Sequence, residues 1–225
     1  AKMGLKRNLA VHEITGQLFN ARFVLGADIR NIVFMGMGEP FDNFDPVIQA
    51  IQIMNEQKGF DIALKQITVS TAGLADKIER FGRLGLNKVR LAVSINSVDN
   101  ATRSRLMPVN RAWPLAELKQ ALLNYPLPNK RGCFLFEYIL IKGLNDSLKD
   151  AIQLAEYIKP LPVRLNLIPC NPVDGFNYQS PDDEEMHAFA GILEQNGIFV
   201  VKRWSRGRSV SAGCGQLGKQ NLGCR

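Results

Sequence analysis

Hydrophobic positions along the chain alternate between two spacings. Nearly continuous apolar runs of strand length predict β-strands, and apolar residues three and four positions apart predict α-helices. The predicted strands lie at 32–36, 65–73, 88–95, 134–141, 163–169 and 198–204. The predicted helices lie between them, at 44–57, 74–85, 114–125, 146–159 and 180–197. The chain is therefore predicted to fold as a βα series.

Residues at the helix ends support these boundaries. Asp146 and Ser180 stand where N-caps are expected, and Pro181 would occupy the first position of the last helix. Gly73, Gly85 and Gly197 mark exits from regular structure, where glycine is favoured.

Strands that are apolar at nearly every position are typical of a parallel sheet with both faces covered. In a βα series this indicates either an open doubly wound sheet or a barrel, and the pattern alone leaves both open. Both architectures bind ligands at the carboxyl ends of their strands. We therefore expect the functional site at those ends.

The composition is that of an ordinary globular protein. The chain has 225 residues, 46% hydrophobic and 22% charged, which is long enough for one domain with a sizeable core. It contains no apolar run of about 20 residues and no signal-peptide pattern, so we expect a soluble, cytoplasmic protein with no membrane partner. The net charge of +7 favours a polyanionic partner such as RNA.

The cysteines and histidines do not form a metal motif. Cys133, Cys170, Cys214 and Cys224 are scattered without a CxxC or CxxxC pair, and a chain of this kind is expected to keep them reduced. His12 and His187 fall on helix-like stretches, where a solvated side chain is the ordinary role. No metal ligand is predicted from these residues.

The predicted strand ends carry unusual chemistry. The first strand ends in "GMGEP", where two glycines allow close approach of a ligand and Glu39 offers a carboxylate to an ammonium group. A tight turn with a solvated Glu39 is an alternative interpretation of the same residues. Ser70, Ser94 and Asn96 at the following strand ends also suit helix caps and turns. Their occurrence at one edge of the sheet favours a shared site.

Five motifs in this order resemble a known family. "GLKRNLAVHEITGQ", "GMGEP", "STAG", "LIPCNP" and "SAGCGQL" are similar to segments of the radical S-adenosylmethionine (SAM) methyltransferases that methylate carbon 2 of adenosine in large-subunit ribosomal RNA and in transfer RNA. The resemblance runs from Ala1 to about Gln220.

The resemblance implies a set of cofactor-binding residues. Gly38 and Glu39 correspond to the pair that binds the methionyl amino group of SAM. The other implied SAM-binding positions are Ser70, Ser94, Ile95, Asn96 and Asn171. Two positions depart from the family pattern, because Asn96 replaces a histidine and Cys170 replaces a tryptophan. An amide at Asn96 keeps hydrogen bonding but carries no charge.

The implied fold is a partial (βα)₆ TIM-like barrel of the radical SAM type. The family holds a [4Fe-4S] cluster with three cysteines of a CxxxCxxC loop after the first strand, and the chain resembles the part that follows that loop. We therefore expect a fragment, inactive alone, whose first strand and cluster loop precede Ala1. Residues 1–203 would form the barrel and 204–225 a C-terminal segment carrying the Cys214 motif.

The implied reaction passes through a methylated cysteine, a role that falls on Cys214. One SAM methylates the thiol. A second SAM yields a 5′-deoxyadenosyl radical that takes a hydrogen from the methyl group on the sulfur, and the resulting methylene radical adds to the base. The implied partners are ribosomal RNA, transfer RNA and an electron donor such as flavodoxin. A related family that methylates carbon 8 remains an alternative.

A basic segment precedes the Cys214 motif. Four cations surround Trp204 and suit an RNA backbone with a splayed base, although a solvated loop has the same composition. They are Lys202, Arg203, Arg206 and Arg208. Two rival functions stay open: a non-catalytic barrel that binds SAM or RNA, and a barrel lyase or aldolase acting on a small phosphorylated substrate.

Overall fold

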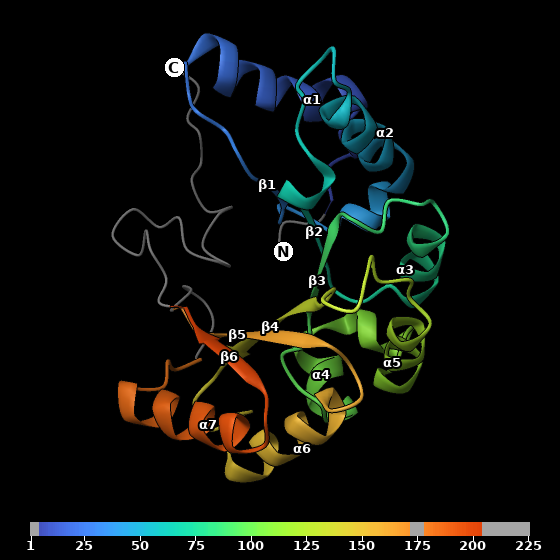
Figure 1. The fold of residues 1–225 in the computed structure, drawn as a ribbon. Helices are drawn as coiled ribbons and strands as arrows, with labels where there is room; N and C mark the ends of the chain where they lie inside the picture. The colour runs from blue at the N-terminus through green and yellow to red at the C-terminus, as the bar shows by residue number, and fades with distance from the viewer. Residues whose placement is uncertain (1–4, 172–177, 204–225) are drawn as a thin grey trace.

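The computed structural model describes residues 5–171 and 178–203 (Figure 1). Its strands form one parallel sheet in sequence order, which confirms the predicted βα series. The strands are β1 (Ile32–Phe34), β2 (Ile67–Thr71), β3 (Arg90–Ser94), β4 (Phe134–Leu140), β5 (Val163–Pro169) and β6 (Phe199–Lys202). The strand around Phe199 extends the sheet by pairing with β5.

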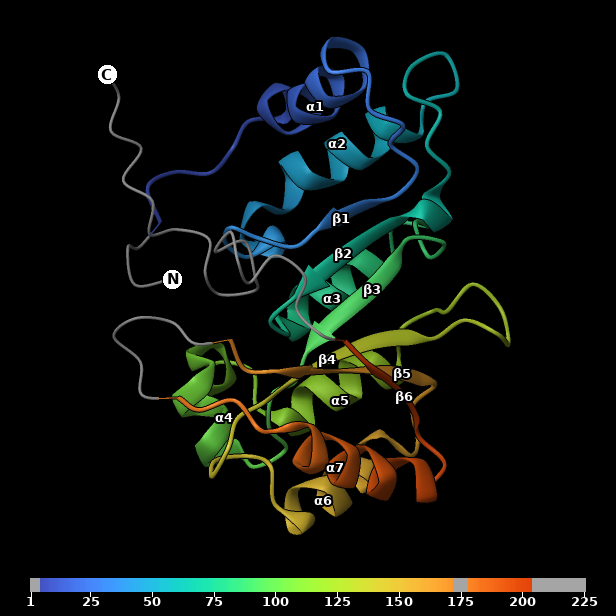
Figure 2. The ribbon, with the colours of Figure 1, turned by 90° about the vertical axis from the view of Figure 1, so that its left-hand side faces the viewer.

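The helices lie along the outer side of this curved sheet (Figures 1 and 2). They are α1 (Val11–Phe19), α2 (Phe44–Asn55), α3 (Ala75–Gly82), α4 (Asn100–Leu106), α5 (Leu115–Leu123), α6 (Leu148–Ile158) and α7 (Asp183–Gln195). The doubly wound alternative would place helices on both faces, so the arrangement is that of an open, partial barrel. We call its inner, concave side the lumen face. None of the described helices is long and apolar enough to cross a membrane.

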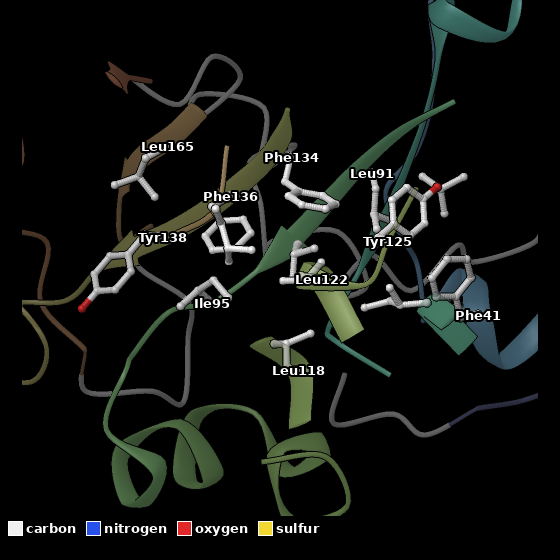
Figure 3. Packing of buried hydrophobic residues seen from close by; sticks show 14 of the residues in the cluster. Phe41, Leu91, Ile95, Leu118, Leu122, Tyr125, Phe134, Phe136, Tyr138 and Leu165 are labelled. Carbon is white, nitrogen blue, oxygen red and sulfur yellow. The ribbon is translucent and has the colours of Figure 1, made fainter. Parts of the chain in front are cut away.

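The sheet's outer face forms the core. Along β4, the side chains of Phe134, Phe136, Tyr138 and Leu140 are fully buried, while the residues between them are half-buried. Side chains alternate between the faces of a strand, so Glu137 lies on the lumen face. Figure 3 shows Phe136 and Tyr138 gathered with Ile95 and Leu118 of the outer core.

Some helix boundaries differ from the prediction. Ser147, not Asp146, caps α6 by accepting a hydrogen bond from the Asp150 amide, and Asp146 instead accepts one from Gly143. Asp182, not Ser180, caps α7 through the Glu185 amide. In both cases a polar residue one or two positions nearer the helix reaches the free amide.

The helix α4 lacks the apolar pattern on which helix prediction depends. Its sequence is NATRSRL, and its only buried residue is Arg103. An arginine is normally assigned to a solvated face, so the pattern gave no sign of a packed helix here.

Candidate functional site at the strand ends

The loop after β1 requires its glycines for conformation. Gly36 has a φ of 86° and Gly38 a φ of 102°, a region that other residues rarely adopt. A Cβ at either position would have no heavy atom within 4 Å, so space is not the constraint. The "GMGEP" motif therefore encodes a particular turn at the carboxyl end of β1.

Glu39 ties this turn to the neighbouring strand. Its Oε1 accepts a hydrogen bond from the Phe41 amide (3.0 Å) and its Oε2 accepts one from the Ala72 amide (2.7 Å), just beyond β2. Burial raises the pKa of the Glu39 carboxyl, and the hydrogen bonds from Ala72 and Phe41 oppose that rise. The Thr71 side chain gives the carboxylate a third hydrogen bond. A carboxylate has about four acceptor sites, so one is left for a ligand. Glu39 is thus both a structural link and an available acceptor.

The Ala72 peptide is held from both sides. While its amide donates to Glu39, its carbonyl accepts a hydrogen bond from Nη2 of Arg103 (2.7 Å). Gly73 follows with a φ of 105°, and a Cβ there would lie 3.0 Å from the same Nη2. The glycine of "STAG" therefore makes room for a buried guanidinium.

Arg103 connects the ends of β2 and β3. Its side chain is fully buried, and besides the Ala72 carbonyl it donates to the carbonyls of Ile95 (3.1 Å) and Ser94 (3.2 Å) and to Oδ1 of Asn110 (2.8 Å). These acceptors are neutral, and burial lowers the pKa of Arg103 to about 10. Sequence reasoning missed this residue, because an arginine in a polar segment normally belongs on the surface.

The predicted rim serines lie on the lumen face. Ser70 alternates along β2 with Val69, which packs in the outer core, and Ser94 ends β3 half-buried. Ile95 differs: its side chain is fully buried in the outer core, its amide donates to the Glu137 carbonyl, and its carbonyl accepts from Arg103. The Ile95 side chain therefore lies away from the lumen face, and its role in cofactor binding stays a prediction.

Asn96 and Asn145 connect the ends of β3 and β4. Asn96 has a φ of 56°, which asparagine tolerates, and its Oδ1 accepts a hydrogen bond from the Ile139 amide (2.9 Å) while its Nδ2 approaches Sδ of Met107 (3.2 Å). The fully buried Asn145 donates to the carbonyls of Asn96 and Ile139 and accepts from the Ile141 amide. Asn96 therefore has a structural role that its sequence position did not reveal.

The remaining predicted residues lie at the far end of the sheet or outside the described part. Asn171 is buried just after β5, next to the buried Cys170, whose amide donates to the Leu140 carbonyl. Lys202 is half-buried on β6, and Arg203 is exposed. Arg206, Arg208 and Cys214 lie outside the described residues.

The described residues do not gather metal ligands. Within 5–171 and 178–203, no three His, Cys, Asp or Glu side chains come together as a metal site would require. A [4Fe-4S] cluster therefore cannot be assigned to the described side chains.

The fold and the rim define a class of protein: a partial βα barrel with a polar edge at its strand ends. No protein-family model matches the chain. A probable dual-specificity RNA methyltransferase RlmN of Protochlamydia amoebophila is 41% identical over 221 residues, which is 98% of this chain and 62% of that protein. A dual-specificity RNA methyltransferase RlmN of Pelobacter propionicus is 45% identical over 95% of this chain and 60% of its own length.

Solved structures agree with these relatives. A radical SAM methyltransferase from Sphaerobacter thermophilus superposes with a TM-score of 0.90 at 39% identity, over 96% of this chain and 63% of that protein. Streptococcus suis SuiB bound to SAM is similar in fold alone (TM-score 0.61, 13% identity). The chain is thus similar, over nearly all of its length, to proteins named RNA methyltransferases and to a radical SAM methyltransferase of known structure. It spans about three fifths of the length of these relatives.

Proposed function

We propose that the protein acts in the transfer of a methyl group from SAM to carbon 2 of adenosine in ribosomal RNA, and also in transfer RNA. The observation that carries this proposal is the identity of about 40% to RNA methyltransferases over 95–98% of the chain. The polar rim at the ends of β1, β2 and β3 supports it, because a barrel binds its ligand there.

The rim residues suit the polar groups of SAM. Glu39 offers a cationic amino group its remaining acceptor site, beside the backbone of Gly38. Ser70, Ser94 and Asn171 offer hydroxyl and amide groups to the carboxylate and the ribose. Asn96 takes part through the turn it holds. When bound, SAM supplies both the methyl group and the radical chemistry, which no side chain provides.

The other residues in the proposal lie at the end of the described residues or outside them. Cys214 is the proposed methyl carrier, on the strength of the "SAGCGQL" motif. Lys202, Arg203, Arg206 and Arg208 are proposed to contact the RNA backbone, and an electron donor such as flavodoxin is the proposed protein partner.

The test is methyl transfer by the full-length protein with its cluster reconstituted. RNA containing the target adenosine is incubated with labelled SAM and a reductant, digested to nucleosides and separated by chromatography. We expect label in 2-methyladenosine. Label in 8-methyladenosine would move the proposal to the carbon-8 family, and SAM binding without any labelled nucleoside would favour a non-catalytic barrel.

Replacing Glu39 should weaken SAM binding. We expect Glu39→Ala to reduce the affinity by about 1.5 to 3 kcal/mol, the range for a lost charge-assisted hydrogen bond, and to lower the melting temperature because the Phe41 and Ala72 amides lose their acceptor. Calorimetry with SAM measures the first effect. Glu156→Ala removes an exposed carboxylate from α6 and serves as the control. Unchanged SAM affinity would remove Glu39 from the site.

SAM affinity should also depend on pH through Glu39. The carboxylate attracts the amino group only when ionised, and its pKa is raised above the ordinary 4.5 by burial. Affinity should therefore be highest at neutral pH and fall as the pH drops through this raised pKa. Titrations at decreasing pH measure the effect, and the slope should disappear in Glu39→Gln. A wild-type affinity that stays constant on acidification would contradict the assignment.

A further inference from the structure

A polar row crosses the lumen face beyond the proposed SAM residues. Ser94 of β3 pairs in register with Glu137 of β4, and Glu137 pairs with Asn166 of β5. Because Phe136 and Tyr138 fill the outer core, Glu137 faces the lumen in line with Ser94. The polar edge therefore continues from β3 toward β6.

Hydrogen bonds hold the row in a fixed order. Nδ2 of Asn166 donates to Oε1 of Glu137 (2.7 Å), and Oδ1 of Asn166 accepts from Nε of Arg203 (2.7 Å). Asn166 is only 4% exposed, and the Arg203 amide also donates to the Leu167 carbonyl (2.9 Å). The carboxylate and the guanidinium are thus both anchored to one buried amide.

Some polar atoms of the row form no hydrogen bond with the described residues. Within the described residues, no donor to Oε2 of Glu137 and no acceptor for either Nη of Arg203 is recorded, and the two charged groups form no ion pair with each other. The two groups still attract each other at longer range, because Arg203 opposes the rise in the pKa of Glu137 that burial causes. The open acceptor of Glu137 faces the lumen at the level of Ser94, which ends β3, and barrels bind their ligands at strand ends.

We propose that Glu137, positioned by Asn166 and Arg203, accepts a hydrogen bond from the exocyclic amino group of an adenine ring bound in the lumen. This inference rests on the proposed function, which brings two adenine rings to the barrel, one in the RNA and one in SAM. An ionised carboxylate only accepts hydrogen bonds, so it matches the 6-amino group of adenine and opposes the 6-carbonyl of hypoxanthine. Glu137 is therefore a specificity-determining residue.

The experiment compares adenine with hypoxanthine in each ligand, using the full-length reconstituted protein. In the RNA arm, kcat/KM is measured for oligonucleotides with adenosine or inosine at the target position. In the SAM arm, calorimetry compares SAM with its deaminated analogue. The wild type and Glu137→Gln are both measured with the adenine and the hypoxanthine form of each ligand. Any intrinsic difference between the two forms therefore cancels when the variants are compared.

The expected result is a change of preference. A glutamine amide can donate to a carbonyl. In the arm whose adenine contacts Glu137, Glu137→Gln should therefore lower kcat/KM for the adenosine RNA, or the affinity for SAM, by about 10- to 100-fold. The same quantity should fall less for the hypoxanthine ligand, so the hypoxanthine-to-adenine ratio should rise. A change confined to the RNA arm would identify the substrate adenine, and one confined to the SAM arm would identify the SAM adenine. Unchanged ratios in both arms would overturn the inference, whatever happens to the melting temperature.

Controls separate recognition from packing. Leu135→Met changes an apolar residue on the same face of β4 and should leave both ratios unchanged. Arg203→Gln removes the anchor and should shift the same ratio as Glu137→Gln, by a smaller factor. If the wild type transfers no methyl group to RNA, the proposed function fails, while the SAM arm still reports whether Glu137 recognises adenine.

Discussion

Cys214→Ala in the full-length, reconstituted protein is expected to abolish RNA methylation. The methyl group is proposed to reach the base through this thiol, and alanine offers no sulfur to carry it. The variant should also lose methyl labelling of the protein itself, while cluster assembly and uncoupled formation of 5′-deoxyadenosine persist. Labelled SAM followed through protein and RNA fractions measures both losses.

Cys224→Ala is the matched control for that experiment. It removes a second thiol from the same C-terminal segment, ten positions further along the chain, and should leave RNA methylation intact. RNA methylation that survives in Cys214→Ala would exclude this residue as the methyl carrier and would remove the proposed route.

Arg103→Met is expected to destabilise the fold by about 3 to 4 kcal/mol. Methionine is close in length but donates no hydrogen bonds, so the carbonyls of Ala72, Ser94 and Ile95 would be left buried with fewer donors. Several such losses are partly offset by no longer burying a charge. Urea denaturation measures the change in the free energy of unfolding.

The control for Arg103 lies on the same helix. Arg105 is exposed on α4, and Arg105→Met should change stability by no more than about 0.5 kcal/mol. Equal effects of the two substitutions would show that the hydrogen bonds of Arg103 to the strand ends contribute little.

The sequence predicted the sheet well because its evidence is local. Each strand is an apolar run, and a parallel order follows from the helices between them, so β1 to β6 were all foreseen. The helix α4 was missed, because its one buried residue is charged and most of its other residues are polar. Apolar periodicity cannot reveal a helix that packs through an arginine.

The site was predictable only as a set of positions. The sequence placed Glu39, Ser70 and Ser94 at one edge, where the structure has them. It could not show that Glu39 links the ends of β1 and β2, or that the Asn96 side chain links β3 to β4. These contacts join residues more than thirty positions apart. They depend on which strands become neighbours, and that information is not contained in any single motif.

The most direct test of the proposed reaction is to count the deuterium atoms that reach the product. The full-length protein is given SAM with a trideuterated methyl group, and the mass of the methylated adenosine is measured by mass spectrometry. If the carbon passes through Cys214 and loses one hydrogen there, the new methyl group should carry two deuterium atoms, and the third should appear in 5′-deoxyadenosine. A methyl group that retains all three would show direct displacement and would contradict the proposed function.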